Sequence, residues 1–120
     1  MPFLPIAEQI TFLNTADLDA TATFYENIFG LKLWKNQGTC RIYQVSLDGY
    51  LGFCQNDTAT GEHPDIIFTL VTPNQAGVDA WYDHLKAQGV EFVKEPATNP
   101  KYQIYHCFLH DPNGYLIEIQ

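Results

Sequence analysis

Apolar residues that recur at helical spacing predict two helices. The first helix begins after Asp17, which can cap it, and ends at Gly30, which can adopt the left-handed backbone of a helix terminus. Its apolar positions are Leu18, Ala22, Tyr25 and Phe29. The second helix follows Pro73 and Asn74 and ends at Gly89. Its apolar positions follow the i, i+3, i+4, i+7 rule and are Val78, Trp81, Tyr82 and Leu85.

Strand-like segments flank the two predicted helices in the same order. In each half, one strand precedes the helix and three follow it, so each half reads βαβββ and the chain is a tandem repeat. The last strand and its turn align between the halves without gaps, residues 48–55 on residues 113–120. The fold class is therefore α+β, in one domain of residues 1–120. Module one covers about 6–55, a polar linker covers 56–65, and module two covers about 66–120.

The composition limits the possible partners. The 120 residues include 46% hydrophobic and 17% charged residues, which suits a packed domain rather than a disordered chain. A net charge of −8 disfavours nucleic acid and anionic membranes as partners. The stretch from Met1 to Pro5 has neither a basic region nor a long apolar run, so we expect no export signal and a cytoplasmic location. Reduced thiols, buried as small apolar side chains, are then expected at Cys40, Cys54 and Cys107.

Two local motifs resemble those of a known superfamily. Ala16-Asp17-Leu18, followed by Phe24-Tyr25 and Gly30-Leu31, is similar to the first helix of the vicinal-oxygen-chelate superfamily. Asp111-Pro112-Asn113-Gly114, leading to Glu118, resembles its terminal turn and strand. That superfamily includes glyoxalase I, extradiol dioxygenases and bleomycin-resistance proteins. The resemblance implies two curved mixed sheets that form a cup, with helices on the convex face, and a homodimer.

The resemblance also implies four metal-ligand positions on the first and last strands of the modules. Only Glu118 carries a ligand side chain. The position that opens module one falls on Ile10, and the one that opens module two falls on Ile67 or Ile66. The fourth position falls on Gly52 if the family's sequence motif sets the register, or on Phe53 if the internal repeat sets it. Three of the four positions therefore lack a metal-binding group. We expect no cofactor, although a divalent metal in a site rebuilt around Glu118 stays open.

The period-2 alternation of strands predicts which side chains face the cup. On the last two strands these include His106, Phe108 and Glu118, with Cys107, Leu109 and Ile117 on the core side. Glu118 and His106 on neighbouring strands could act as a general acid–base pair. Arg41 would favour an anionic ligand if it lined the cup. Further ligand-binding candidates are Tyr43, Phe108, Tyr102 and Phe12, and Tyr105 could join Tyr102 in an aromatic wall.

Three function classes remain open from the sequence. The first is a small-molecule enzyme with lyase-like or dioxygenase-like activity that uses Glu118 and His106. The second is a non-catalytic protein that sequesters an aromatic, drug-like ligand, as the bleomycin-resistance relatives do. The third is a structural protein whose cup is filled by its own side chains.

Overall fold

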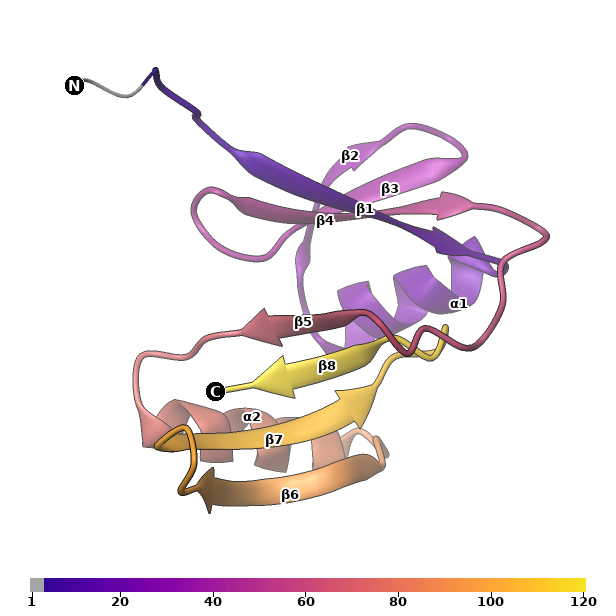
Figure 1. Cartoon of the computed structure of the whole chain (residues 1–120). Helices are drawn as coiled ribbons and strands as arrows, with labels where there is room; N and C mark the ends of the chain where they lie inside the picture. Colours follow the sequence, from indigo (N-terminus) through magenta and orange to yellow (C-terminus); the bar gives the residue numbers. More distant parts are fainter. Residues whose placement is uncertain (1–3) are drawn as a thin grey trace. The chain divides into compact units, whose positions relative to one another are not determined.

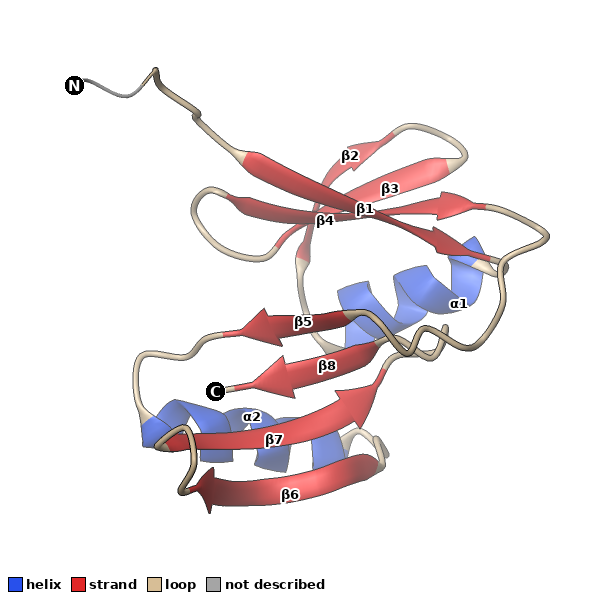
Figure 2. Ribbon diagram, in the orientation of Figure 1, coloured by secondary structure: helices blue, strands red, loops and turns tan. Residues whose placement is uncertain are grey.

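The structure is a computed structural model that describes residues 4–120; Met1–Phe3 lie outside the described residues. The chain forms two compact units, one ending at Thr60 and the other covering Gly61–Gln120. Each unit has the βαβββ order and one four-stranded mixed sheet, as predicted (Figures 1 and 2).

The first unit contains four strands and one continuous helical segment. Its sheet has the order β1-β4-β3-β2, in which β1 and β4 are parallel and the other pairs are antiparallel. The elements are β1 (Gln9–Thr15), α1 (Leu18–Ala22), η1 (Thr23–Ile28), β2 (Lys32–Asn36), β3 (Cys40–Gln44) and β4 (Gly49–Gln55).

The helix of the first unit begins and ends where the sequence predicts. The Asp17 carboxylate accepts a hydrogen bond from the backbone N–H of Ala20 at 3.0 Å, which caps the first turn. The helix then widens into the π-helical segment η1, where the N–H of Phe29 donates to the carbonyl of Phe24. Gly30 follows with φ +82°, a conformation that favours glycine.

Aromatic side chains fill the space between this helix and its sheet. The Tyr25 ring stacks on Phe53 with ring centroids 4.6 Å apart, and it lies 6.0 Å from the Tyr43 ring. All three side chains are fully buried. Phe53 and Tyr43 therefore belong to the helix-covered face of the sheet, and their strand neighbours Gly52 and Ile42 point to the opposite, open face.

The second unit repeats this arrangement with the sheet order β5-β8-β7-β6. Here β5 and β8 are parallel and the other pairs are antiparallel. The elements are β5 (Ile67–Leu70), α2 (Gln75–Ala87), β6 (Phe92–Asn99), β7 (Ile104–His110) and β8 (Leu116–Ile119).

Helix α2 covers one face of the second sheet. The Asn74 side chain caps it by accepting from the N–H of Gly77 at 3.0 Å. The buried residues of α2, β7 and β8 form the core, which contains Val78, Leu85, Cys107, Leu109, Ile117 and Ile119. Alternation along β7 and β8 then places the residues between these on the open face of the sheet, as predicted.

Strand β6 is longer than the sequence indicates. The Pro, Asn and Tyr residues within 96–105 predict a loop from the sequence, but β6 continues to Asn99 and leaves only a short connection to β7. Pro96 is tolerated because β6 is an edge strand, and the register shifts between Lys94 and Ala97.

The cysteine prediction was wrong for two of the three residues. Cys40 and Cys54 are direct neighbours on the antiparallel strands β3 and β4, and they form a disulfide. The wide sequence spacing hid this pair, because only the strand pairing brings the two residues together. Cys107 is a free, fully buried thiol, as expected.

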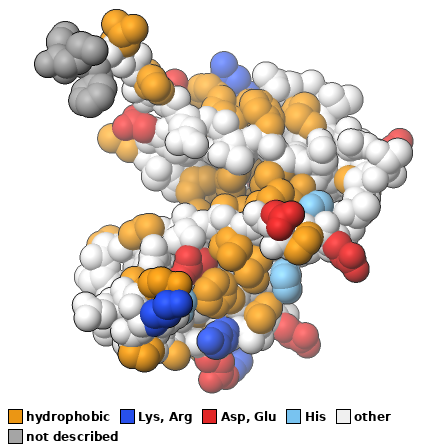
Figure 3. All heavy atoms as spheres, in the orientation of Figure 1, with side chains coloured by type: hydrophobic (Ala, Val, Ile, Leu, Met, Phe, Trp, Pro, Cys, Tyr) orange, Lys and Arg blue, Asp and Glu red, His pale blue; other side chains and the backbone are white. Residues whose placement is uncertain are grey.

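Hydrophobic side chains reach the surface of both units (Figure 3). The largest exposed ones include Leu4, Ile6, Phe12, Ile67, Val71 and Tyr102. Within residues 4–120, no helix has the length and hydropathy needed to cross a membrane.

Candidate functional site

The open face of the second sheet carries a cluster of three polar side chains from three adjacent strands. Thr69 on β5 lies directly opposite Glu118 on β8, and Phe108 on β7 lies opposite Glu118 from the other side. His106 is two residues from Phe108 and so shares its face. The parallel β5–β8 pair and the antiparallel β7–β8 pair thus bring Thr69, Glu118 and Phe108 into one row, and His106 lies beside this row on the same face.

Hydrogen bonds join the three polar groups. The Nδ1 atom of His106 lies 2.5 Å from Oε2 of Glu118. The Thr69 hydroxyl donates to the other carboxylate oxygen, Oε1, at 2.6 Å. Charge-assisted hydrogen bonds of this length are among the stronger contacts in proteins.

Two members of the cluster, His106 and Glu118, are shielded from water, whereas Thr69 is exposed. The side chain of His106 is 8% exposed and that of Glu118 is 13% exposed. The Phe108 ring meets the His106 ring edge-on, with centroids 4.7 Å apart. A carboxylate accepts only, so the imidazole Nδ1 is the donor to an ionised Glu118. That assignment leaves Nε2 of His106 as the acceptor nitrogen of the ring.

Thr69 was not predicted from the sequence. Its partner Glu118 is 49 residues away, and the link depends on the β5–β8 register. The signal that could have found it is the position of Thr69 two residues after Ile67, on the same side of a predicted strand.

The two units show which residue of the first sheet corresponds to Glu118. Ile10 lies seven residues before the helix cap Asp17, and Ile67 lies seven before the helix cap Asn74. Phe12 then corresponds to Thr69, and Gly52, which pairs with Phe12, corresponds to Glu118. The ungapped alignment of the two terminal strands is therefore wrong by one residue.

The donor set does not fit the metal site that the resemblance implies. Three of its four positions are Ile10, Gly52 and Ile67, whose side chains offer no ligand atom. The fourth, Glu118, already accepts from Thr69 and contacts His106. No cluster of three or more His, Cys, Asp or Glu side chains able to hold a metal ion occurs among residues 4–120.

Arg41 and Tyr43 lie away from the open faces, which is at odds with their predicted role in ligand binding. Arg41 pairs with Phe53 across the sheet and so shares the helix-covered face. Its guanidinium lies 3.7 Å from Asp19 and 3.9 Å from Glu26, both on the helix. The Tyr43 hydroxyl donates to Glu26 at 3.0 Å, and burial together with this carboxylate raises the pKa of Tyr43. An arginine on the core side is tolerated because these carboxylates offset its charge.

The other aromatic candidates divide between the faces. Phe108 lies beside His106, and Phe12 is half exposed on the open face of the first sheet. Tyr102 is exposed in the turn between β6 and β7. Tyr105 does not join it, because its hydroxyl donates to Asp79 on α2, and this carboxylate raises the pKa of Tyr105.

Comparison with known proteins supports the resemblance in the sequence. The sequence profile of the Glyoxalase/Bleomycin resistance protein/Dioxygenase superfamily matches residues 7–119. The chain belongs to this superfamily. This chain is 28% identical to "Probable lactoylglutathione lyase" of Vibrio cholerae, and the alignment covers 91% of this chain and 86% of that protein.

Solved structures share the fold at lower identity. Lactoylglutathione lyase from Agrobacterium tumefaciens has a TM-score of 0.76 and 22% identity, covering 97% of this chain and 93% of that one. The bleomycin resistance determinant of transposon Tn5 has a TM-score of 0.76 and 21% identity, covering 93% and 94%. Lyase and resistance protein resemble this chain equally well, so the fold alone does not choose between enzyme and binder.

Proposed function

We propose that this glyoxalase-superfamily protein binds a small molecule on the open face of its second sheet and transfers a proton through His106. The substrate class is a small carbonyl, diol or anionic compound. The observation that carries the proposal is the 2.5 Å contact between His106 Nδ1 and Glu118 Oε2.

The three side chains have distinct roles in this proposal. Thr69 holds one carboxylate oxygen of Glu118, which leaves the other to orient the imidazole. Glu118 then stabilises the imidazolium that forms when Nε2 of His106 takes a proton from the substrate. The proton returns to a neighbouring substrate atom from the same nitrogen, so the step balances as an isomerisation by proton shift. Low exposure of both side chains strengthens the electrostatic interaction between them.

The activity named for the Vibrio cholerae relative supplies the first assay, formation of lactoylglutathione by protein prepared in the presence of a chelator. We expect His106→Asn and Glu118→Gln to lower kcat/KM by about 10²–10⁴-fold, the usual contribution of a positioned acid–base group. Tyr43→Phe is the matched control, since its hydroxyl lies on the helix-covered face. Activity that depends on added metal, or that survives in His106→Asn, would contradict the proposed role.

A second candidate function is ligand sequestration without turnover. Phe108, whose ring meets that of His106 edge-on, offers aromatic surface for a flat ligand on the second sheet. The excess of acidic groups favours a cationic ligand. Calorimetric titration with cationic aromatic drugs, with product analysis of the same samples, separates the two functions. Tight binding with unchanged ligand supports sequestration, and product formation supports the enzyme.

The proposal includes a cytoplasmic homodimer that acts without nucleic acid or membrane partners. The superfamily resemblance and the net charge of −8 support it. Light scattering coupled to size-exclusion chromatography measures the mass, where 13.6 kDa per chain makes a monomer and a dimer easy to distinguish.

A further inference from the structure

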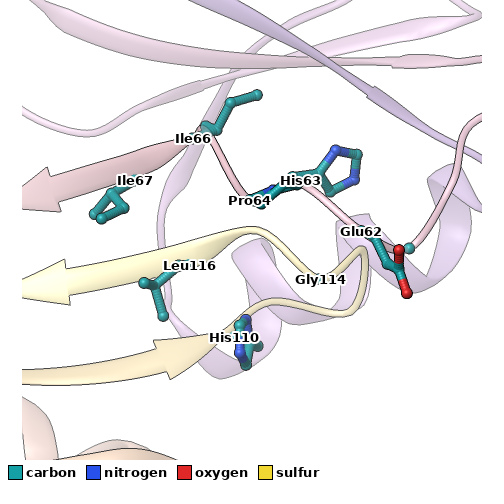
Figure 4. Close-up of a pocket in the computed structure, with 9 residues that line it drawn as sticks. Glu62, His63, Pro64, Ile66, Ile67, His110, Gly114 and Leu116 are labelled. Atoms are coloured by element: carbon teal, nitrogen blue, oxygen red, sulfur yellow. The ribbon is translucent and has the colours of Figure 1, made fainter.

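A pocket lies at the edge of the second unit, formed by strand residues and the segment that enters β5. It has a volume of about 360 Å³. Figure 4 shows three of its residues on the strands, Ile67 on β5, Leu116 on β8 and His110 at the end of β7. The remaining lining residues are Gly61, Glu62, His63, Pro64, Ile66 and Gly114.

The strand residues form a continuous row. Ile67 pairs with Leu116, and Leu116 pairs with His110. This row lies two residues from the Thr69–Glu118–Phe108 row along each strand and on the same face, so the pocket adjoins the proposed catalytic cluster without including it.

A close backbone contact fixes the opposite wall. Gly114 has φ +85°, and a Cβ atom at this position would lie only 2.0 Å from the carbonyl oxygen of Gly61. Asp111 holds the turn by accepting from the N–H groups of Asn113 and Tyr115, each at 2.9 Å. The incoming segment is therefore held directly against the turn before β8.

His63 supplies the polar group that a ligand can recognise. Its ring stacks on Tyr115 with centroids 3.8 Å apart and planes 15° apart. Its Nε2 atom is buried and has no hydrogen-bond partner within residues 4–120. Because an unpaired buried polar atom costs free energy, a ligand that supplies its hydrogen bond gains affinity.

We propose that this pocket binds a neutral aromatic molecule that carries one hydroxyl group. A hydroxyl both donates and accepts, so it can satisfy Nε2 of His63 in either tautomer. Ile66, Ile67 and Leu116 supply an apolar surface for the ring. Glu62 and the net charge of −8 oppose an anion. The volume of about 360 Å³ suits a ligand of roughly ten to fifteen non-hydrogen atoms, judged against roughly 30 Å³ for each water.

The probe is 2-naphthol, titrated into the ¹⁵N-labelled full chain and followed by amide chemical shifts. We expect saturable shifts within 61–67 and 110–116, and an affinity about five- to tenfold lower in His63→Phe, the effect of losing one neutral hydrogen bond. The phenylalanine keeps a flat ring for Tyr115. His84→Phe makes the same chemical change on α2, outside the pocket, and should bind like the wild type.

Two further variants make the test decisive. Leu116→Trp fills the pocket and should abolish binding even if His63→Phe folds poorly. Glu118→Gln should bind 2-naphthol normally, so loss of lactoylglutathione formation in that variant reports on the catalytic proposal alone. Wild-type affinity in His63→Phe, shifts confined to other segments, or tighter binding of naphthalene-2-carboxylate than of 2-naphthol would each overturn the pocket proposal.

Discussion

The ring of Phe12 lies directly over Gly52, its neighbour on the adjacent parallel strand. A Cβ atom at position 52 would lie 2.6 Å from Cδ1 and Cε1 of that ring. Gly52 occupies the place in the first sheet that Glu118 occupies in the second. In this unit an aromatic ring therefore covers the site where the superfamily resemblance places a carboxylate.

This contact predicts that Gly52→Ala has opposite effects on the free energy of unfolding in the wild type and in a Phe12→Ala variant. With Phe12 present, Gly52→Ala should lower the free energy of unfolding by about 1–3 kcal/mol, because the added methyl group overpacks the ring. In a Phe12→Ala background the same substitution should raise stability by about 0.5–1 kcal/mol, because alanine loses less backbone entropy than glycine. Urea denaturation of the four proteins in this cycle measures both values. An equal effect in both backgrounds would show that the ring does not lie over Gly52.

The same pair decides between the two registers that the sequence left open for this strand. The ungapped alignment of the two repeats makes Phe53 the equivalent of Glu118. The strand pairing in the two sheets makes Gly52 the equivalent residue instead. A shift of one residue moves every side chain of a strand to the other face. Local patterns on the last two strands were sufficient to place His106 and Glu118 on one face of the sheet. Thr69 required the pairing between β5 and β8, which sequence spacing does not contain.

The metal content should be far below one ion per chain. The protein is purified without chelator or nickel affinity and then incubated with Ni, Co, Mn, Fe(II) or Zn before elemental analysis. We expect no stoichiometric uptake, because Ile10, Gly52 and Ile67 provide no ligand atoms. Stoichiometric uptake that disappears in Glu118→Gln would instead establish a rebuilt site that uses Glu118.

Cys107 makes stability depend on pH in alkaline solution. Burial, with a smaller contribution from Asp79, raises the pKa of the Cys107 thiol from 9.0 to about 11. Below pH 9 the thiol is protonated in both folded and unfolded chains, so it adds no pH dependence. Between about pH 9 and 11 only the unfolded chain loses this proton, so the free energy of unfolding should fall by about 1–3 kcal/mol.

Urea denaturation at pH 8 and pH 10.5 measures this effect, with Cys107→Ala as the control. The alanine variant removes the thiol and changes the free energy of unfolding by the same amount at both pH values. Tyrosine ionisation affects both proteins alike. The difference between the two proteins therefore isolates Cys107. An identical pH dependence in both would show that the thiol is accessible to water in the folded protein.

Arg41 illustrates a limit of reasoning about charge from sequence. From the sequence, a single arginine within a strand can face the cup, the solvent or a carboxylate partner such as Glu118, because an unpaired charge on the core face is costly. Its partners are instead Asp19 and Glu26, on the helix that packs over β3. The ion pairs with the helix explain why the Arg41 side chain lies on the helix-covered face of the sheet. Alternation along β3 alone does not show which of the two faces the helix covers.

The Cys40–Cys54 pair gives the last prediction. The two residues are 14 positions apart in sequence, and closing a loop of this size stabilises a protein by about 3 kcal/mol in the chain-entropy account. Protein unfolded without reductant should therefore show one reactive thiol, Cys107, and reductant should release the other two. Reductant should also lower the free energy of unfolding by about 2–4 kcal/mol, while a Cys40→Ser, Cys54→Ser variant should not respond. Three reactive thiols in protein isolated under non-oxidising conditions would instead mean that the cell keeps this pair reduced, which is the usual state of thiols in the cytoplasm.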